Sequence, residues 1–111
     1  MSQAPTHRLD NSAKPRKGSM TRWGRAEEAA VYAPGIVWVT TPSHGGFWIS
    51  PERLAKMPER LRALSVSRDC WFEEDCAWCA VPLAFPEDLA EVMDVDGARD
   101  FYRANKRYIY P

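Results

Sequence analysis

The sequence predicts a small α+β domain, and three observations lead to this prediction. Residues 36–41 and 47–50 are rich in β-branched and aromatic side chains and flank a Pro/Gly loop, as in a β-hairpin. A helix start signal follows at residues 50–53, with Ser at the cap, Pro at the first helical position and Glu in the first turn. The chain has 111 residues, 45% of them hydrophobic and 27% charged, which is typical of one globular domain.

Residues 69–85 are predicted to form a central helix, because they hold all three cysteines and two of the five tryptophans in a largely apolar segment. Asp69 is placed to cap this helix, and the acids at 73–75 would lie near its first turn, where the helix dipole favours carboxylates. Pro82 is expected to kink or end it. We expect a β-hairpin or small antiparallel sheet, with three or four short helices, to pack around it.

The flanking segments supply these smaller elements. Residues 23–33 suit either one or two helical turns or a first strand, and both alternatives stay open. Residues 50–64 are expected to form two short helices separated at Pro58. Their apolar face consists of Leu54, Met57, Leu61 and Leu64, and Arg53, Lys56, Arg60 and Arg62 are expected to point outward. Further helices are expected at about 86–93 and 97–106.

The N-terminal residues are predicted to be a basic flexible arm, residues 1–20, on a single α+β domain, residues 21–111. Residues 1–25 carry six Lys or Arg against Asp10 alone, although the whole chain has a net charge of zero. Such an arm is either a solubilising tail or a contact to a phosphate backbone. For the second function the candidates are Lys14, Arg16, Lys17, Arg22 and Arg25. No apolar run approaches the roughly 18 residues of a membrane span, which predicts a cytoplasmic protein.

The cysteines offer one possible metal site. Cys70, Cys76 and Cys79, together with His44, have the residue types of a Cys3His zinc site. Because Cys76 and Cys79 fall within one predicted helix, three buried thiols are favoured instead, and no cofactor is predicted.

A second constellation combines His44 with Glu73, Glu74 and Asp75. If the hairpin loop lay over the start of the predicted helix, these groups would hold a divalent metal or act as an acid/base pair. This pattern indicates a metal-assisted hydrolase or nuclease as an alternative function. In the other interpretation, the glycines after His44 turn the chain, His44 bonds a backbone group, and the acids complement the helix dipole.

Two blocks carry a resemblance to a known group of proteins: Thr-Pro-Ser-His-Gly-Gly-Phe-Trp-Ile-Ser-Pro-Glu-Arg at 41–53 and Trp-Phe-Glu-Glu-Asp-Cys-Ala-Trp at 71–78. Over roughly residues 35–105 the sequence resembles a small uncharacterised domain of bacterial phage, prophage and plasmid proteins. The resemblance implies no catalytic residues. It implies a mobile-element protein in the bacterial host cell, and single-domain proteins of that origin often act by binding, including as anti-CRISPR or other counter-defence proteins.

The leading prediction is therefore a non-enzymatic protein-binding module whose partner is a bacterial protein or ribonucleoprotein complex. A nucleic-acid-binding accessory protein that acts through the basic arm is a further alternative. Aromatic and arginine side chains dominate the energetics of protein interfaces. The predicted partner contacts are accordingly Trp23, Trp38, Trp48, Arg53, Arg60, Tyr108 and Tyr110.

Overall fold

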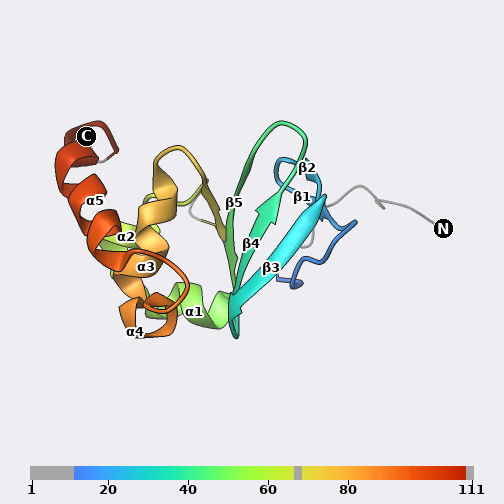
Figure 1. Cartoon of the computed structure of the whole chain (residues 1–111), viewed down its shortest axis with the longest axis horizontal. Helices are drawn as coiled ribbons and strands as arrows, with labels where there is room; N and C mark the ends of the chain where they lie inside the picture. The colour runs from blue at the N-terminus through green and yellow to red at the C-terminus, as the bar shows by residue number, and fades with distance from the viewer. Residues whose placement is uncertain (1–11, 67–68, 110–111) are drawn as a thin grey trace.

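The computed structural model describes residues 12–66 and 69–109, and it confirms the predicted small α+β domain (Figure 1). The strands, in chain order, are β1 (Met20–Thr21), β2 (Gly24–Arg25), β3 (Glu28–Ala33), β4 (Ile36–Thr40), β5 (Gly45–Ile49) and β6 (Trp71–Glu73). The helices are α1 (Pro51–Lys56), α2 (Glu59–Arg62), the 3-10 helix η2 (Ala77–Cys79), α3 (Ala80–Ala84), α4 (Pro86–Leu89) and α5 (Val95–Ile109).

Four of the strands form one antiparallel sheet in the order β3-β4-β5-β6, and β1 and β2 form a separate two-stranded hairpin. The hairpin predicted between residues 36 and 50 is confirmed as β4 and β5, joined by the short loop at 42–44. Of the two alternatives for residues 23–33, the strand is the one observed, as β2 and β3.

Both faces of the sheet are covered. The helices gather on one face, and the β1–β2 hairpin lies at the other end of the molecule (Figure 1). Alternate residues along each strand point to opposite faces, which divides the apolar side chains into two clusters. The helix-side cluster includes Ile36, Phe47, Ile49, Phe72, Met57, Leu61, Val81 and Leu89. The second cluster consists of Val37, Val39, Trp48, Cys70 and Trp71. Every residue of β5 is buried, so β5 is the central element of the fold.

The central helix predicted over residues 69–85 is wrong in its first half. Trp71 and Phe72 lie in β6, where they pair with Trp48 and Phe47 of β5. These two aromatic side chains therefore enter opposite clusters, which a strand permits and one helix face does not. Helical structure begins at Ala77, and Pro82 is the third residue of α3, which ends two residues later at Ala84.

The helix starts follow the sequence signals. The Ser50 hydroxyl accepts the N–H of Arg53 at 3.2 Å, and Pro51 is the first residue of α1, as predicted. The Asp94 carboxylate accepts the N–H of Gly97 at 2.9 Å at the start of α5. Within the ranges described, no helix is both long enough and apolar enough to cross a membrane.

The hairpin that contains β1 and β2 begins before residue 21, the predicted start of the domain. The backbone N–H of Gly18 donates to the carbonyl of Ala26 at 2.8 Å, and the Arg25 guanidinium donates to the carbonyl of Gly18 at 2.7 Å. Residues 18–26 therefore close on themselves as a hairpin that leads into β3. The first half of the predicted arm, residues 1–11, lies outside the described residues.

Candidate functional site

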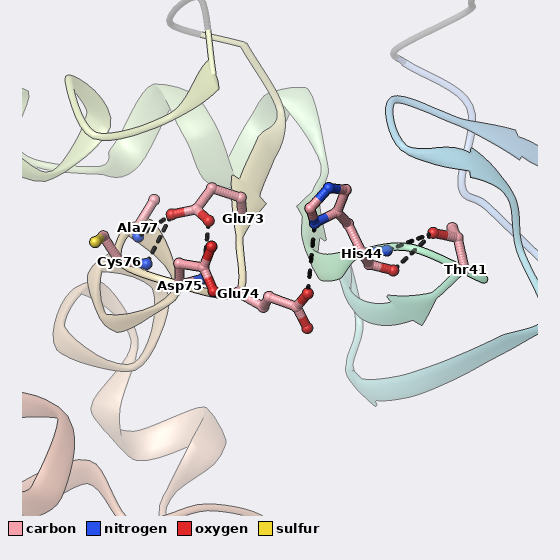
Figure 2. A network of polar contacts seen from close by, with 7 residues as sticks. All are labelled: Thr41, His44, Glu73, Glu74, Asp75, Cys76 and Ala77. Carbon is pink, nitrogen blue, oxygen red and sulfur yellow. Dashed lines mark hydrogen bonds and ion pairs between the residues drawn. The ribbon is translucent and has the colours of Figure 1, made fainter.

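His44 and Glu74 come together at the end of the central hairpin (Figure 2). The Thr41 hydroxyl accepts the N–H of His44 at 3.1 Å and donates to its carbonyl at 2.7 Å, which fixes the loop. The carbonyl of the next residue, Gly45, accepts the N–H of Glu74 at 3.0 Å. These bonds bring His44 Nδ1 to 3.8 Å from Glu74 Oε1, with the two side chains 58% and 39% exposed. The result is a solvent-facing contact between the imidazole and the carboxylate.

Glu73 has a structural role and points away from His44 (Figure 2). Its carboxylate accepts three backbone N–H groups, from Asp75 at 2.8 Å, Cys76 at 2.7 Å and Ala77 at 3.1 Å. These N–H groups belong to the turn that connects β6 to η2 and have no helical acceptor. The Glu73 side chain therefore ends the strand and starts the helical turn.

The set predicted for metal-assisted hydrolysis is only half assembled. His44 and Glu74 meet, Glu73 is engaged with backbone groups, and Asp75 is exposed in the turn. No group of three or more His, Cys, Asp or Glu side chains is placed to hold a metal ion within residues 12–66 and 69–109. An exposed pair of this kind contributes about 0–1 kcal/mol to stability.

The cysteines do not form the Cys3His set either. All three are free thiols, and Cys70 and Cys79 are buried, but Cys76 is exposed, so the prediction of three buried thiols is wrong for Cys76. Burial, aided by the nearby Asp69 carboxylate, raises the pKa of Cys70 to about 12. Burial likewise raises the pKa of Cys79 to about 11. Metal binding and nucleophilic attack both need the thiolate, so these protonated thiols suit a packing role.

The predicted aromatic contacts divide by burial. Trp48 is only 2% exposed and belongs to the second cluster, so its prediction as a partner contact is wrong. Trp23 and Trp38 are half-buried: Trp23 stands edge-on to Trp71 at 5.5 Å between ring centroids, and Trp38 stands edge-on to Phe47 at 4.8 Å. Tyr110 and the side chain of Tyr108 lie outside what the structure describes.

Arg53 is only partly exposed and is held by bonds within the fold, and its contact with a partner stays a prediction. Its Nε donates to the carbonyl of Pro34 at 2.9 Å, and its guanidinium pairs with Asp88 and lies 4.8 Å from the centre of the Phe85 ring. The side chain is 18% exposed. Arg60, in contrast, is exposed as predicted.

The basic residues proposed to contact a phosphate backbone are all on the surface. Lys17 lies 4.0 Å from Glu28, and Arg25 bonds the carbonyl of Gly18. The full set of exposed side chains is Lys14, Arg16, Lys17, Arg22 and Arg25. Their contact with nucleic acid stays a prediction.

The outer edge of β3 is a feature that the sequence prediction missed. Hydrogen bonds between Thr41 and His44 and between Gly35 and Ser50 show that the odd-numbered residues of β4 bond to β5. The even-numbered residues of β4 therefore bond to β3. Since Ala29 and Val31 lie opposite Val39 and Val37, their backbone groups point away from the sheet. In the described part of the chain, no strand pairs with that side of β3.

The side chains of this edge are uncharged and partly exposed. Residues 29–33 are Ala-Ala-Val-Tyr-Ala, and Val31 is 54% exposed. The opposite edge strand, β6, is only three residues long, and its Trp71 and Phe72 are buried. Short length is one way in which proteins protect a sheet edge from pairing with another chain. The sheet thus has one protected edge and one accessible edge.

Comparison with protein families matches residues 16–111 to a domain of unknown function, DUF7007. Comparisons with curated proteins and with solved structures found no match. The family match covers the sheet, all the helices and the β1–β2 hairpin.

Proposed function

The chain belongs to the DUF7007 family of domains of unknown function, and on that premise we propose that it is a non-enzymatic protein-binding module. Its partner adds an extended segment to the outer edge of β3. The observation that carries this proposal is the outward orientation of the backbone groups of Ala29 and Val31, in a strand without charge from residue 29 to residue 33.

Sheet edges of this kind are usually blunted by charges, prolines or very short strands, because their free N–H and C=O groups pair readily with another chain. β3 has six residues, and its first residue, Glu28, is its only charged one. In β-strand addition, main-chain hydrogen bonds supply affinity and alternate side chains supply specificity. The β3 edge offers both kinds of contact. Its outward backbone groups can form main-chain hydrogen bonds, and the exposed Val31 side chain can contact side chains of the added segment.

Trp38 provides the aromatic contact next to this edge. In the register of the sheet it lies opposite Ala30, one strand inward from the edge, and it is half-buried. Residues on adjacent strands interact across the sheet, and aromatic side chains also reach diagonal neighbours. A large side chain of the added segment, placed beside the small Ala30, would contact the Trp38 ring.

The resemblance to mobile-element proteins suggests the class of partner. We propose a bacterial protein or ribonucleoprotein complex of host defence, which this module would inhibit in the manner of an anti-CRISPR protein.

Two lysine substitutions test the proposal. Val31→Lys puts a charge on the proposed edge, and Val92→Lys, at a site 49% exposed, is its matched control away from the sheet. Proteins captured from a bacterial host lysate are identified by mass spectrometry with wild type and both variants. A specific partner should be retained by wild type and V92K and lost by V31K. Capture by both variants alike, or no capture above an unrelated bait, would contradict the proposal.

A proline substitution separates the backbone contribution from the side-chain contribution. Ala29→Pro removes an N–H that points outward, and proline is tolerated at such positions of edge strands. We expect A29P to fold and to lose the partner. Ala30→Pro removes an N–H that bonds to β4, so it should destabilise the fold itself.

A further inference from the structure

Three arginines converge on a pocket of about 360 Å³ between α2, α3 and α5. Arg60 comes from α2, Leu83 from α3, and Arg99, Tyr102 and Arg103 from α5. Helix α3 packs against both α2 and α5, so it holds the two arginine-bearing helices on either side of Leu83. Figure 1 shows these three helices together, in a different part of the molecule from β3.

The spacing of the α5 residues explains why they share the pocket. Arg99 and Arg103 are four residues apart, and Tyr102 is three residues after Arg99, so all three lie on neighbouring positions of one helix face. Tyr102 also packs against the helix-side cluster, which anchors this face of α5. The pocket therefore has a fixed apolar wall, made by Leu83 and Tyr102, and a cationic rim.

The charge of this rim is only partly compensated. Arg99 pairs with Asp96 at 2.7 Å, and the Asp96 side chain is 89% exposed. Arg60 and Arg103 form no ion pair or hydrogen bond with the residues that the structure describes. Arg60 and Arg103 therefore leave positive charge at the rim that is available to an anionic ligand.

We propose that this pocket binds a phosphate monoester attached to a compact aromatic or aliphatic group. A guanidinium presents a planar fork of donors that matches phosphate oxygens in pairs, which is why arginine is favoured for phosphate recognition. The phosphate sits against Arg60, Arg99 and Arg103, and the attached group lies on Leu83 and Tyr102. A volume of this size fits a small ligand, since ligand pockets usually span about 300–1,000 Å³.

An acidic protein segment is the competing ligand, and the shape of the site favours the phosphate monoester. A segment of several carboxylates would need cations spread along a surface, whereas these three arginines surround one concave pocket. The proposal goes beyond the protein-binding function and does not depend on it, because none of the pocket residues belongs to β3 or β4.

Phenyl phosphate is the probe, because it combines a dianion with an aromatic ring. Binding to the full chain is measured by isothermal titration calorimetry beside inorganic phosphate, phenol and benzoate. We expect phenyl phosphate to bind more tightly than inorganic phosphate and benzoate, phenol not to bind, and the affinity to fall as salt is raised. Benzoate binding as tight as phenyl phosphate binding would assign the site to carboxylates and overturn the proposal, as would the absence of phenyl phosphate binding.

Substitutions locate the site. Arg60→Gln and Arg103→Gln should each weaken phenyl phosphate binding about tenfold or more, since each removes a charge-assisted contact. Arg22→Gln, at an exposed arginine of the β1–β2 hairpin, is the matched control and should bind as wild type. Equal weakening by R22Q would show nonspecific attraction and contradict the pocket assignment. Arg60→Lys keeps the charge but loses the planar pair of guanidinium donors, so it should also weaken phenyl phosphate binding. This variant replaces R60Q in the test if R60Q fails to fold.

Asp96→Asn tests whether Arg99 contacts the ligand, because a purely structural role of Arg99 would not change the affinity for phenyl phosphate. The substitution releases Arg99 from its partner, so phenyl phosphate should bind a few times more tightly. Unchanged or weaker binding in D96N would exclude Arg99 from the ligand contacts and contradict the three-arginine site.

Discussion

The indole of Trp23 packs on Gly46, so closely that a β-carbon at position 46 would come within 2.7 Å of Trp23 Cη2. The same carbon would collide with the carbonyl oxygen of Phe72. Trp23 also contacts Trp71 edge-on, so this side chain joins the β1–β2 hairpin to the second cluster. Two neighbouring segments approach β5 closely at Gly46, and its φ of +158° is one that other residues rarely adopt, so both the space and the backbone require a glycine here.

The first prediction follows from this contact. Gly46→Ala should destabilise the protein by about 3 kcal/mol, because the added methyl group forces either Trp23 or β6 away from β5. Gly18→Ala is the control: Gly18 has a φ of +91° but open space around it, so a loss of about 1 kcal/mol is expected. Urea denaturation measures both, and equal losses would contradict the close packing.

The second prediction separates the two neighbouring glutamates. Glu73→Gln replaces one acceptor oxygen by an NH2 group and should cost about 1–2 kcal/mol, because turn N–H groups lose their acceptor. Glu74→Gln changes only an exposed contact with His44 and should change stability by less than about 0.5 kcal/mol. Thermal unfolding of the two variants tests this order, and a larger loss in E74Q would reverse the assigned roles.

The third prediction concerns Arg53. Arg53→Lys keeps the charge but cannot bond Pro34 and Asp88 at once while lying on Phe85, so a loss of about 1–2 kcal/mol is expected. Arg60→Lys makes the same change at an arginine without a described partner and should leave stability unchanged. Differential scanning calorimetry should show a lower Tm for R53K alone.

The fourth prediction is a loss of stability at alkaline pH. Burial raises the pKa of Cys70 to about 12 and that of Cys79 to about 11, from an ordinary value of 9.0 that applies when the chain unfolds. Between these values the unfolded chain releases thiol protons that the folded chain keeps, so stability is complete below about pH 9 and falls as the pH rises towards 11–12.

Cysteine variants and labelling check this effect. Cys70→Ala and Cys79→Ala should each flatten the alkaline part of the stability curve, whatever they cost in packing. In the folded wild type, iodoacetamide should modify the exposed Cys76 and leave the two buried thiols intact. An alkaline limb unchanged in both variants would assign the loss of stability to other groups.

Local sequence signals predicted those elements whose chemistry is local. The Ser50 cap needs only its own hydroxyl and the N–H of Arg53 three residues later. The β4–β5 hairpin was predicted because β-branched and aromatic residues flank a short loop. The α+β class followed from both. Of the acids that the sequence groups with His44, only Glu74 lies beside it. The two meet because the loop before β5 and the residue after β6 are neighbours in the sheet.

The sequence by itself determined the start of α1 and the central hairpin. Only the tertiary structure decided that Trp71 and Phe72 form a strand, since a short apolar segment fits a helix or a strand until its partner is known. Pairing with β5 bonds the backbone of β6 on one side and sends the two rings into opposite clusters. The same pairing order leaves β3 at the edge, and helix packing brings Arg60 to Arg99 and Arg103. These relationships join residues far apart in the chain, which no local pattern encodes.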